Sequence, residues 1–200
     1  LERQGTTVVM LADRQRVLAL FVVADTARDS SRSAIAELHA LGIRTLMLTG
    51  DNPHAAQAIG RQVGITEVRG NQLPQDKLAA ISSLARGGHV VGMVGDGIND
   101  APALAQADIG FAMGALGTDT AIETADVALM DDDLHKLASF VRLSQATHRI
   151  LVQNISLAIG IKAVFLALTI AGLGTMWMAV FADVGASLLV VANGLRMVRK

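Results

Sequence analysis

Residues 90–102 read VVGMVGDGINDAP, and this stretch decides the fold. Its apolar, valine-rich first half predicts a buried parallel strand, and its second half predicts a turn into a helix. Asp96 and Asp100 stand four residues apart, so a helix that begins at Asn99 would bring both carboxylates to one small volume at the carboxyl edge of a sheet. Mg²⁺ that shares its shell with a phosphate is the natural occupant of such a pair. Taken alone, Asp-Gly and Asn-Asp are also ordinary turn residues, so a plain turn is the alternative.

The composition restricts the classes of function. The chain has 200 residues, 52% of them hydrophobic, and its net charge of -1 argues against a nucleic-acid partner. It contains no cysteine, which excludes disulfides and thiolate metal ligands and suits a reducing compartment. The N-terminus at Leu1 carries no targeting signal, and we expect it to be a cut end.

Strands alternate with helices along most of the chain. The patterns predict a hairpin over 6–11 and 17–23, strands at 43–48, 67–69, 90–94, 108–112 and 126–130, and helices over 30–41, 54–63, 75–85 and 134–149. Ser30 or Ser31 is expected to cap the first of these helices. The alternation predicts an α/β fold with a doubly wound parallel sheet of the Rossmann type.

A second candidate site follows the second predicted strand of this sheet. Thr49, Gly50 and Asp51 lead into Asn52, which suits a helix cap, and Pro53, which suits a first helical position. The free backbone N–H groups of that helix start would point towards Thr49, which outlines a phosphate site. A capped helix without a ligand is the alternative.

Lys77 lies in the first turn of the helix predicted over 75–85. A cation at a helix start is mildly unfavourable with the helix dipole, so its placement invites an anionic partner. A solvated surface lysine is the alternative.

The end of the chain is apolar. Residues 155–173 and 175–195 are stretches of about twenty residues, each long enough to cross a bilayer core. Basic residues flank them on one side only, so the positive-inside rule places both ends in the cytoplasm. They are Arg142 and Arg149 before the stretches and Arg196, Arg199 and Lys200 after them. A soluble apolar helical hairpin is the alternative.

Lys162 and Asp183 are charged residues inside these two stretches, where a charge is unfavourable by several kcal/mol, about 3 on insertion scales. Both are about ten residues from the link, so they lie at nearly one depth and can pair. If the transported species is a divalent cation, Asp183 is a candidate ligand and Lys162 a built-in counter-charge. An ion pair that only locks two helices together is the alternative.

Several motifs agree in order and spacing, and together they resemble the C-terminal part of a heavy-metal P-type ATPase, whose phosphorylation domain belongs to the haloacid-dehalogenase superfamily. The matching pieces are Asp25-x-x-Arg28, Thr49-Gly50-Asp51, Pro74-x-x-Lys77, the Gly95–Pro102 string, Gly117-Thr118-Asp119 and the apolar hairpin. The resemblance implies three regions: the end of the nucleotide-binding domain and hinge (1–24), the phosphorylation domain (25–148) and a transmembrane hairpin (149–200).

The resemblance also implies roles for single residues. Thr49 would contact the phosphoryl group, and Lys77 would offset charge around the aspartyl phosphate. Asp96 and Asp100 would serve Mg²⁺, and Asn99 would hold the phosphorylated site by hydrogen bonding. The ATP nucleotide would lie near Asp25 and Arg28.

The hairpin resembles the zinc, cadmium and lead branch, which has a Lys in the seventh span and Asp-x-Gly-Ala in the eighth, here Lys162 and Asp183–Ala186. The copper branch uses a Tyr-Asn pair, and this chain has no tyrosine. Met176 and Met178 lie near the outer end of the span and are expected to be lining or lipid-facing packing. The resemblance therefore implies a multi-pass pump in the plasma (inner) membrane that exports Zn²⁺, Cd²⁺ or Pb²⁺, with its phosphorylation domain and C-terminus in the cytoplasm.

The family's phosphate acceptor lies in an Asp-Lys-Thr-Gly-Thr string, which these 200 residues do not contain. The chain alone is therefore expected to be inactive, and the remaining domains of the same ATPase are its expected partners. Three alternatives stay open: a copper-type pump, a non-catalytic membrane module, and a membrane-anchored phosphatase with Asp25 as nucleophile. The phosphatase reading is weakened by Ala27, which stands where such enzymes carry a general acid.

Overall fold

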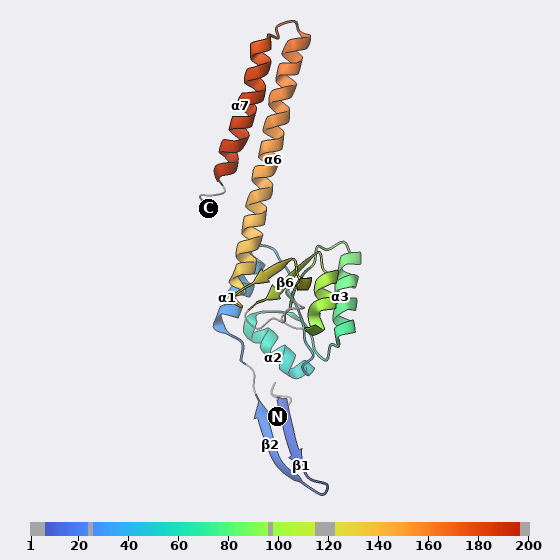
Figure 1. Ribbon diagram of the computed structural model, residues 1–200. Coiled ribbons are helices and arrows are strands. Elements are labelled where there is room, and N and C mark those ends of the chain that lie inside the picture. Colours follow the sequence, from blue (N-terminus) through green and yellow to red (C-terminus); the bar gives the residue numbers. More distant parts are fainter. Residues whose placement is uncertain (1–6, 24–25, 96–97, 115–122, 197–200) are drawn as a thin grey trace. The chain divides into compact units, whose positions relative to one another are not determined.

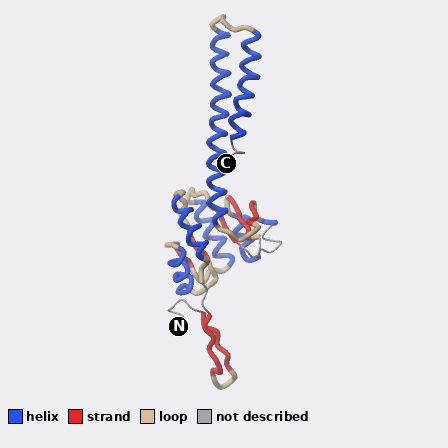
Figure 2. The backbone as a smooth tube through the Cα atoms, turned by 90° about the vertical axis from the view of Figure 1, so that its left-hand side faces the viewer, coloured by secondary structure: helices blue, strands red, loops and turns tan. Residues whose placement is uncertain are grey.

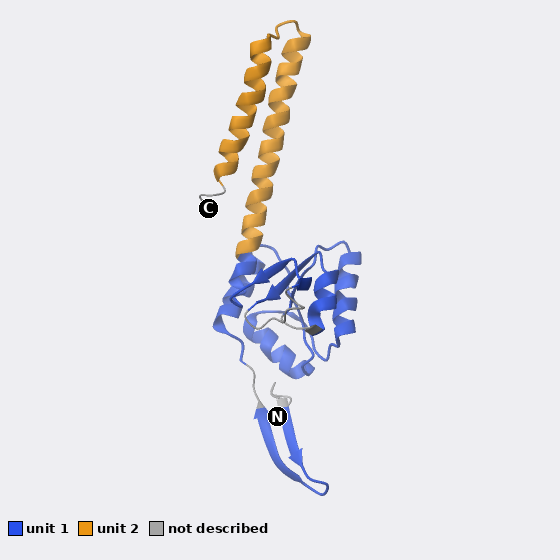
Figure 3. Cartoon of the chain, viewed as in Figure 1, with its two compact units in different colours: residues 1–138 blue, residues 139–200 orange. Residues whose placement is uncertain are grey.

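The computed structural model describes residues 7–23, 26–95, 98–114 and 123–196. The chain divides into two compact units, Leu1–Ala138 and Ser139–Lys200 (Figure 3). Each unit is described by itself below.

An antiparallel hairpin opens the first unit, as predicted. Its strands are β1 (Thr7–Ala12) and β2 (Val17–Val23). In the turn, Asp13 Oδ1 accepts backbone N–H groups of Gln15 and Arg16, both at 2.8 Å. These hydrogen bonds favour the ionised carboxylate and hold the pKa of Asp13 below its ordinary value.

Alternating strands and helices form the rest of the first unit (Figure 1). In chain order they are α1 (Asp29–Ala40), β3 (Leu46–Leu48), α2 (Pro53–Val63), β4 (Glu67–Arg69), α3 (Pro74–Arg86), β5 (Gly92–Gly95), the 3₁₀ turn η2 (Ile98–Asp100), α4 (Ala101–Gln106), β6 (Ile109–Met113) and β7 (Val127–Leu129). Strand β3 pairs with β4, and β6 lies between β5 and β7; all three pairings are parallel. This confirms the predicted α/β fold with a parallel sheet.

The core of this unit lies between β5, β6 and the helices α3 and α4. Its buried members are Ile81, Val91, Met93, Ala103, Leu104 and Ala112. Two carboxylates fix the starts of neighbouring strands: Asp108 accepts the N–H of Val91, and Asp126 accepts the N–H of Gly110, both at 2.8 Å. The core therefore holds β5 in place, and the candidate site follows directly from its carboxyl end.

Two local predictions differ from the structure. The N-cap of α1 is Arg28, without a side-chain cap, so the predicted cap at Ser30 or Ser31 is wrong. Asp29 already occupies the first turn, where its charge complements the helix dipole. The helix expected to begin at Asn99 begins instead at Ala101, as α4, after η2. Pro102 lacks an N–H and therefore fits only the first turn of a helix.

The second unit is formed by α6 and α7. Helix α6 (His135–Ile170) begins in the first unit, and α7 is Met176–Gly194. The tube in Figure 2 shows them running in opposite directions. Both are long and apolar enough to cross a membrane by length and composition. The helix predicted over 134–149 and the first apolar stretch are thus one continuous helix.

Candidate functional site

Lys77 and Asp100 form a largely buried ion pair at the end of β5. Lys77 Nζ lies 2.7 Å from Asp100 Oδ1, and the two side chains are 15% and 12% exposed. Gly95 makes room for this carboxylate, since a Cβ there would lie 2.7 Å from the Cβ of Asp100. The anionic partner that the sequence predicts for Lys77 is therefore found, and it is one of the two predicted Mg²⁺ carboxylates.

Thr49 and Asp51 form a turn at the end of β3. Thr49 Oγ1 donates to Asp51 Oδ2 at 2.8 Å, and the backbone N–H of Asp51 donates to Thr49 Oγ1 at 3.2 Å. Asn52 caps α2, as predicted, by accepting the N–H of Ala55 at 2.9 Å. The hydroxyl of Thr49 is thus fixed immediately before a helix start, where an anion is favoured.

A loop after β4 supports this turn, and the sequence did not identify it. Asn71 N–H donates to Asp51 O at 2.7 Å, and Gln72 N–H donates to Thr49 O at 2.9 Å. Gly70 is packed so closely that a Cβ would lie 2.8 Å from Asp51 O. Because α3 begins directly after this loop, the loop connects the Thr49 turn to the helix that carries Lys77. The Gly-Asn dipeptide is a common turn signal that could have marked it.

The other predicted site residues lie as follows. Gly50 is an exposed bend beside Thr49, Asn99 is exposed within η2, and Arg28 is exposed before α1. Three predictions fall on residues outside those that the structure describes: Asp25, Asp96 and Gly117-Thr118-Asp119.

Lys162 on α6 and Asp183 on α7 are brought together, as predicted. Lys162 Nζ lies 3.6 Å from Asp183 Oδ1, and the side chains are 67% and 74% exposed in this chain. A cavity of about 230 Å³ begins at this pair and continues to the link between the helices. Both charges are therefore accessible from one hollow of the hairpin.

A group of polar side chains lies at the other end of the hairpin. Asn193 Nδ2 donates to Asn154 Oδ1 at 2.8 Å, and Arg196 Nη1 donates to Asn193 Oδ1 at 3.0 Å. This contact was not predicted from the sequence. Its signal is a pair of asparagines at corresponding ends of the two apolar stretches, since amides in such helices hydrogen-bond across to each other.

The arrangement suits two kinds of chemistry. In the first unit, a fixed hydroxyl, an ammonium and buried carboxylate oxygens are groups that hold a phosphoryl group and a hard cation. In the second unit, a carboxylate paired with an ammonium can exchange that ammonium for a metal cation.

The comparisons with known proteins agree with this description. The chain is 53% identical over its whole length to a protein of Listeria monocytogenes described as a probable cadmium-transporting ATPase. It is 47% identical over 99% of its length to the cadmium, zinc and cobalt-transporting ATPase of Bacillus subtilis. It spans 28% and 29% of these two relatives.

A crystal structure of a zinc-transporting PIB-type ATPase in the E2.Pi state is also similar, with a TM-score of 0.88 and 46% identity. The match covers 98% of this chain and 32% of that one. Residues 1–108, which include β3, β5 and the Lys77–Asp100 pair, match the family described as haloacid dehalogenase-like hydrolase. The chain therefore belongs to the haloacid dehalogenase-like hydrolase family.

Proposed function

We propose that this chain is the C-terminal portion of a P-type ATPase that exports divalent heavy-metal ions, namely Zn²⁺, Cd²⁺ or Pb²⁺. The observation that carries the proposal is the ion pair between Lys162 and Asp183, 3.6 Å apart, in two helices long enough to cross a membrane. Charged groups inside the hydrocarbon core of a membrane are unfavourable, and where they occur they usually serve ion transport. A phosphatase held at the membrane by an anchor needs no such pair.

The first unit holds the phosphorylated centre. The Thr49 hydroxyl contacts the phosphoryl group, and the Lys77 ammonium offsets its negative charge. Asn99, exposed next to Asp100, holds the phosphorylated segment by hydrogen bonding. The aspartate that accepts the phosphate comes from the remaining domains of the same protein.

Asp100 would hold Mg²⁺ through its carboxylate, and Asp96 would be the second protein ligand. Lys77 occupies Oδ1 of Asp100, and Oδ2 lies over Gly95, where a Cβ would be 3.0 Å away. A hard cation prefers such oxygen ligands. When bound, Mg²⁺ would supply positive charge beside the phosphoryl group, and Asp25 and Arg28 would contribute to holding the ATP nucleotide.

The second unit holds the transport site. Asp183 is a ligand for the cation, and Lys162 takes the carboxylate when the cation has left. The relatives described as cadmium, zinc and lead transporters support a divalent cation of this group. The basic residues Arg142, Arg149 and Arg196 flank the hairpin on one side, which favours a cytoplasmic first unit and C-terminus in the plasma (inner) membrane.

Asp183→Ala in the full-length protein tests the proposal. We expect Zn²⁺- and Cd²⁺-stimulated ATP hydrolysis to fall to its metal-free level, because the cation loses its carboxylate ligand. The matched control is Val184→Ala, since Val184 is the next residue on α7 and is 53% exposed. Unchanged metal stimulation in the Asp183 variant would refute the transport site.

A further inference from the structure

The cavity beside Asp183 contains more than the ion pair. Apart from Lys162 and Asp183, it is lined on α6 by Phe165, Leu166 and Thr169, and on the other side by Gly174, Thr175, Met178, Ala179 and Ala182. Three of these residues carry neutral atoms that can bind a cation: the sulfur of Met178 and the hydroxyls of Thr169 and Thr175. They lie between Asp183 and the link, on the side of the hairpin away from its basic flank.

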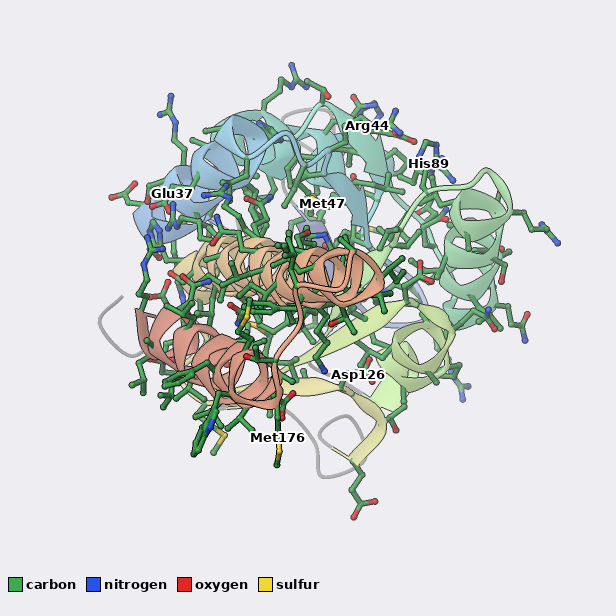
Figure 4. All side chains as sticks on the ribbon, turned by 90° about the horizontal axis from the view of Figure 1, so that it is seen from above. Glu37, Arg44, Met47, His89, Asp126 and Met176 are labelled. Atoms are coloured by element: carbon green, nitrogen blue, oxygen red, sulfur yellow. The ribbon has the colours of Figure 1, made fainter. Side chains whose placement is uncertain are left out.

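Met178 belongs to the face of α7 that packs on α6. Ala182 and Ala186, one and two turns further along that face, are buried at 8% and 5% exposure. Met178 is half-buried, whereas its neighbours Met176 and Trp177 are 84% and 74% exposed. Figure 4 shows Met176 extending away from α6. The two methionines therefore differ: Met178 lines the cavity, and Met176 is not among its lining residues.

The hydroxyl groups present oxygen atoms near the same space. Thr169 Oγ1 donates its hydrogen to Phe165 O at 2.9 Å, which leaves oxygen lone pairs for another partner. Thr175 Oγ1 caps α7 by accepting the N–H of Met178 at 3.3 Å. Gly174 allows the link to approach Thr169, since a Cβ there would lie 2.6 Å from Thr169 Oγ1.

We propose that Met178, with Thr169 and Thr175, forms a second and weaker cation site on the release side of Asp183, and that its thioether favours Cd²⁺ over Zn²⁺. This inference rests on the proposed function. A thioether is a soft ligand, and Cd²⁺ is a softer cation than Zn²⁺. The three ligands are neutral, so the site holds a cation only briefly, as release requires, while Lys162 repels the cation from the side of Asp183.

Met178→Leu in the full-length protein tests this site, because leucine has a similar volume but no sulfur. ATP-driven uptake of Cd²⁺ and of Zn²⁺ is measured in parallel in inside-out membrane vesicles. We expect the ratio of Cd²⁺ to Zn²⁺ uptake to fall roughly fivefold, because Cd²⁺, the softer cation, depends more strongly on the sulfur ligand than Zn²⁺ does. Met176→Leu is the matched control and should leave the ratio unchanged.

A second variant separates ligand chemistry from packing. Met178→Cys restores a soft sulfur ligand in a smaller side chain, and it should recover part of the Cd²⁺ preference that Met178→Leu loses. The site would be overturned if Met178→Leu lowered the uptake of both metals equally or lowered neither. It would also be overturned if Met176→Leu changed the uptake ratio as Met178→Leu does. If the unchanged protein moves neither metal, the proposed pump itself fails, which is a distinct result.

Discussion

Lys77 Nζ lies 2.7 Å from Asp100 Oδ1, in a pair whose side chains are 15% and 12% exposed. Removing two charged groups from water is unfavourable, so the pair adds little net stability. Its chief effect is to fix the positions of the two charged groups. The pair joins the first turn of α3, which follows β4, to η2, which follows β5. The cation and the carboxylate of the candidate phosphoryl site are thereby fixed together.

Replacing Lys77 by Met should expose the dependence of Asp100 on its partner. The variant leaves a buried carboxylate without its cation, and we expect a loss of about 3 kcal/mol in the free energy of unfolding. Thermal or urea unfolding of the detergent-solubilised chain measures it. Adding Asp100→Asn should recover much of the loss, because the uncompensated charge is then gone. Equal stability of Lys77→Met and the unchanged chain would contradict this account of the pair.

Gly95→Ala should displace Asp100 although it leaves every charge in place. The added Cβ would lie 2.7 Å from the Cβ of Asp100, so the Asp100 side chain must shift from its position. We expect a loss of about 2 kcal/mol in the free energy of unfolding. Gly92→Ala on the same strand is the control, since its Cβ would meet Phe111 at an ordinary 3.5 Å, with a change below about 0.5 kcal/mol. Similar effects of the two variants would argue against a steric role for Gly95.

Gly70→Ala should loosen the Thr49 turn. A Cβ at this position would lie 2.8 Å from both Asp51 O and the Cα of Pro53. The amide of Gln72, which donates to Thr49 O, should then exchange its hydrogen about tenfold faster. Gly50→Ala, whose Cβ would be 3.7 Å from Gln72 O, should have little effect on that exchange. Unchanged protection in Gly70→Ala would show that the loop does not support the turn.

The 200-residue chain by itself should form no acid-stable phosphoenzyme with ATP. It lacks an Asp-Lys-Thr-Gly-Thr string, so the aspartate that accepts the phosphate is missing. Acid gel electrophoresis after incubation with labelled ATP and Mg²⁺ checks this. A clear phosphorylated band would instead favour a self-sufficient enzyme.

The sequence predicted those parts of the fold that depend on local signals. Asn52 and Pro53 define a helix start by their own chemistry, and the structure has that cap. The valine-rich run before Gly95 became β5, although the strand begins only at Gly92. The predicted caps Ser30 and Ser31 were wrong because α1 begins before them, with Asp29 in its first turn. The preference of a residue type for a position in a helix is only a weak guide to where the helix begins.

Contacts between distant residues were harder to predict. Lys77 and Asp100 are separated by 23 residues, and each was assigned to the site without their direct pairing being foreseen. The importance of Gly70 depends on the close approach of Asp51 and Pro53, which no local pattern encodes. The described strands also pair as separate groups, β3 with β4 and β5 with β6 and β7. Between the starts of β3 and β5, Arg44 Nη2 lies 3.3 Å from His89 Nδ1 (Figure 4).

We propose that the full-length protein couples ATP hydrolysis to the export of a divalent heavy metal. The most direct test is metal uptake by inside-out vesicles that contain the full-length protein, with Mg²⁺ and ATP outside. We predict ATP-dependent accumulation of Zn²⁺ and Cd²⁺ that is abolished when a non-hydrolysable analogue replaces ATP. ATP or phosphate-ester hydrolysis that neither depends on these metals nor moves them would contradict the claim.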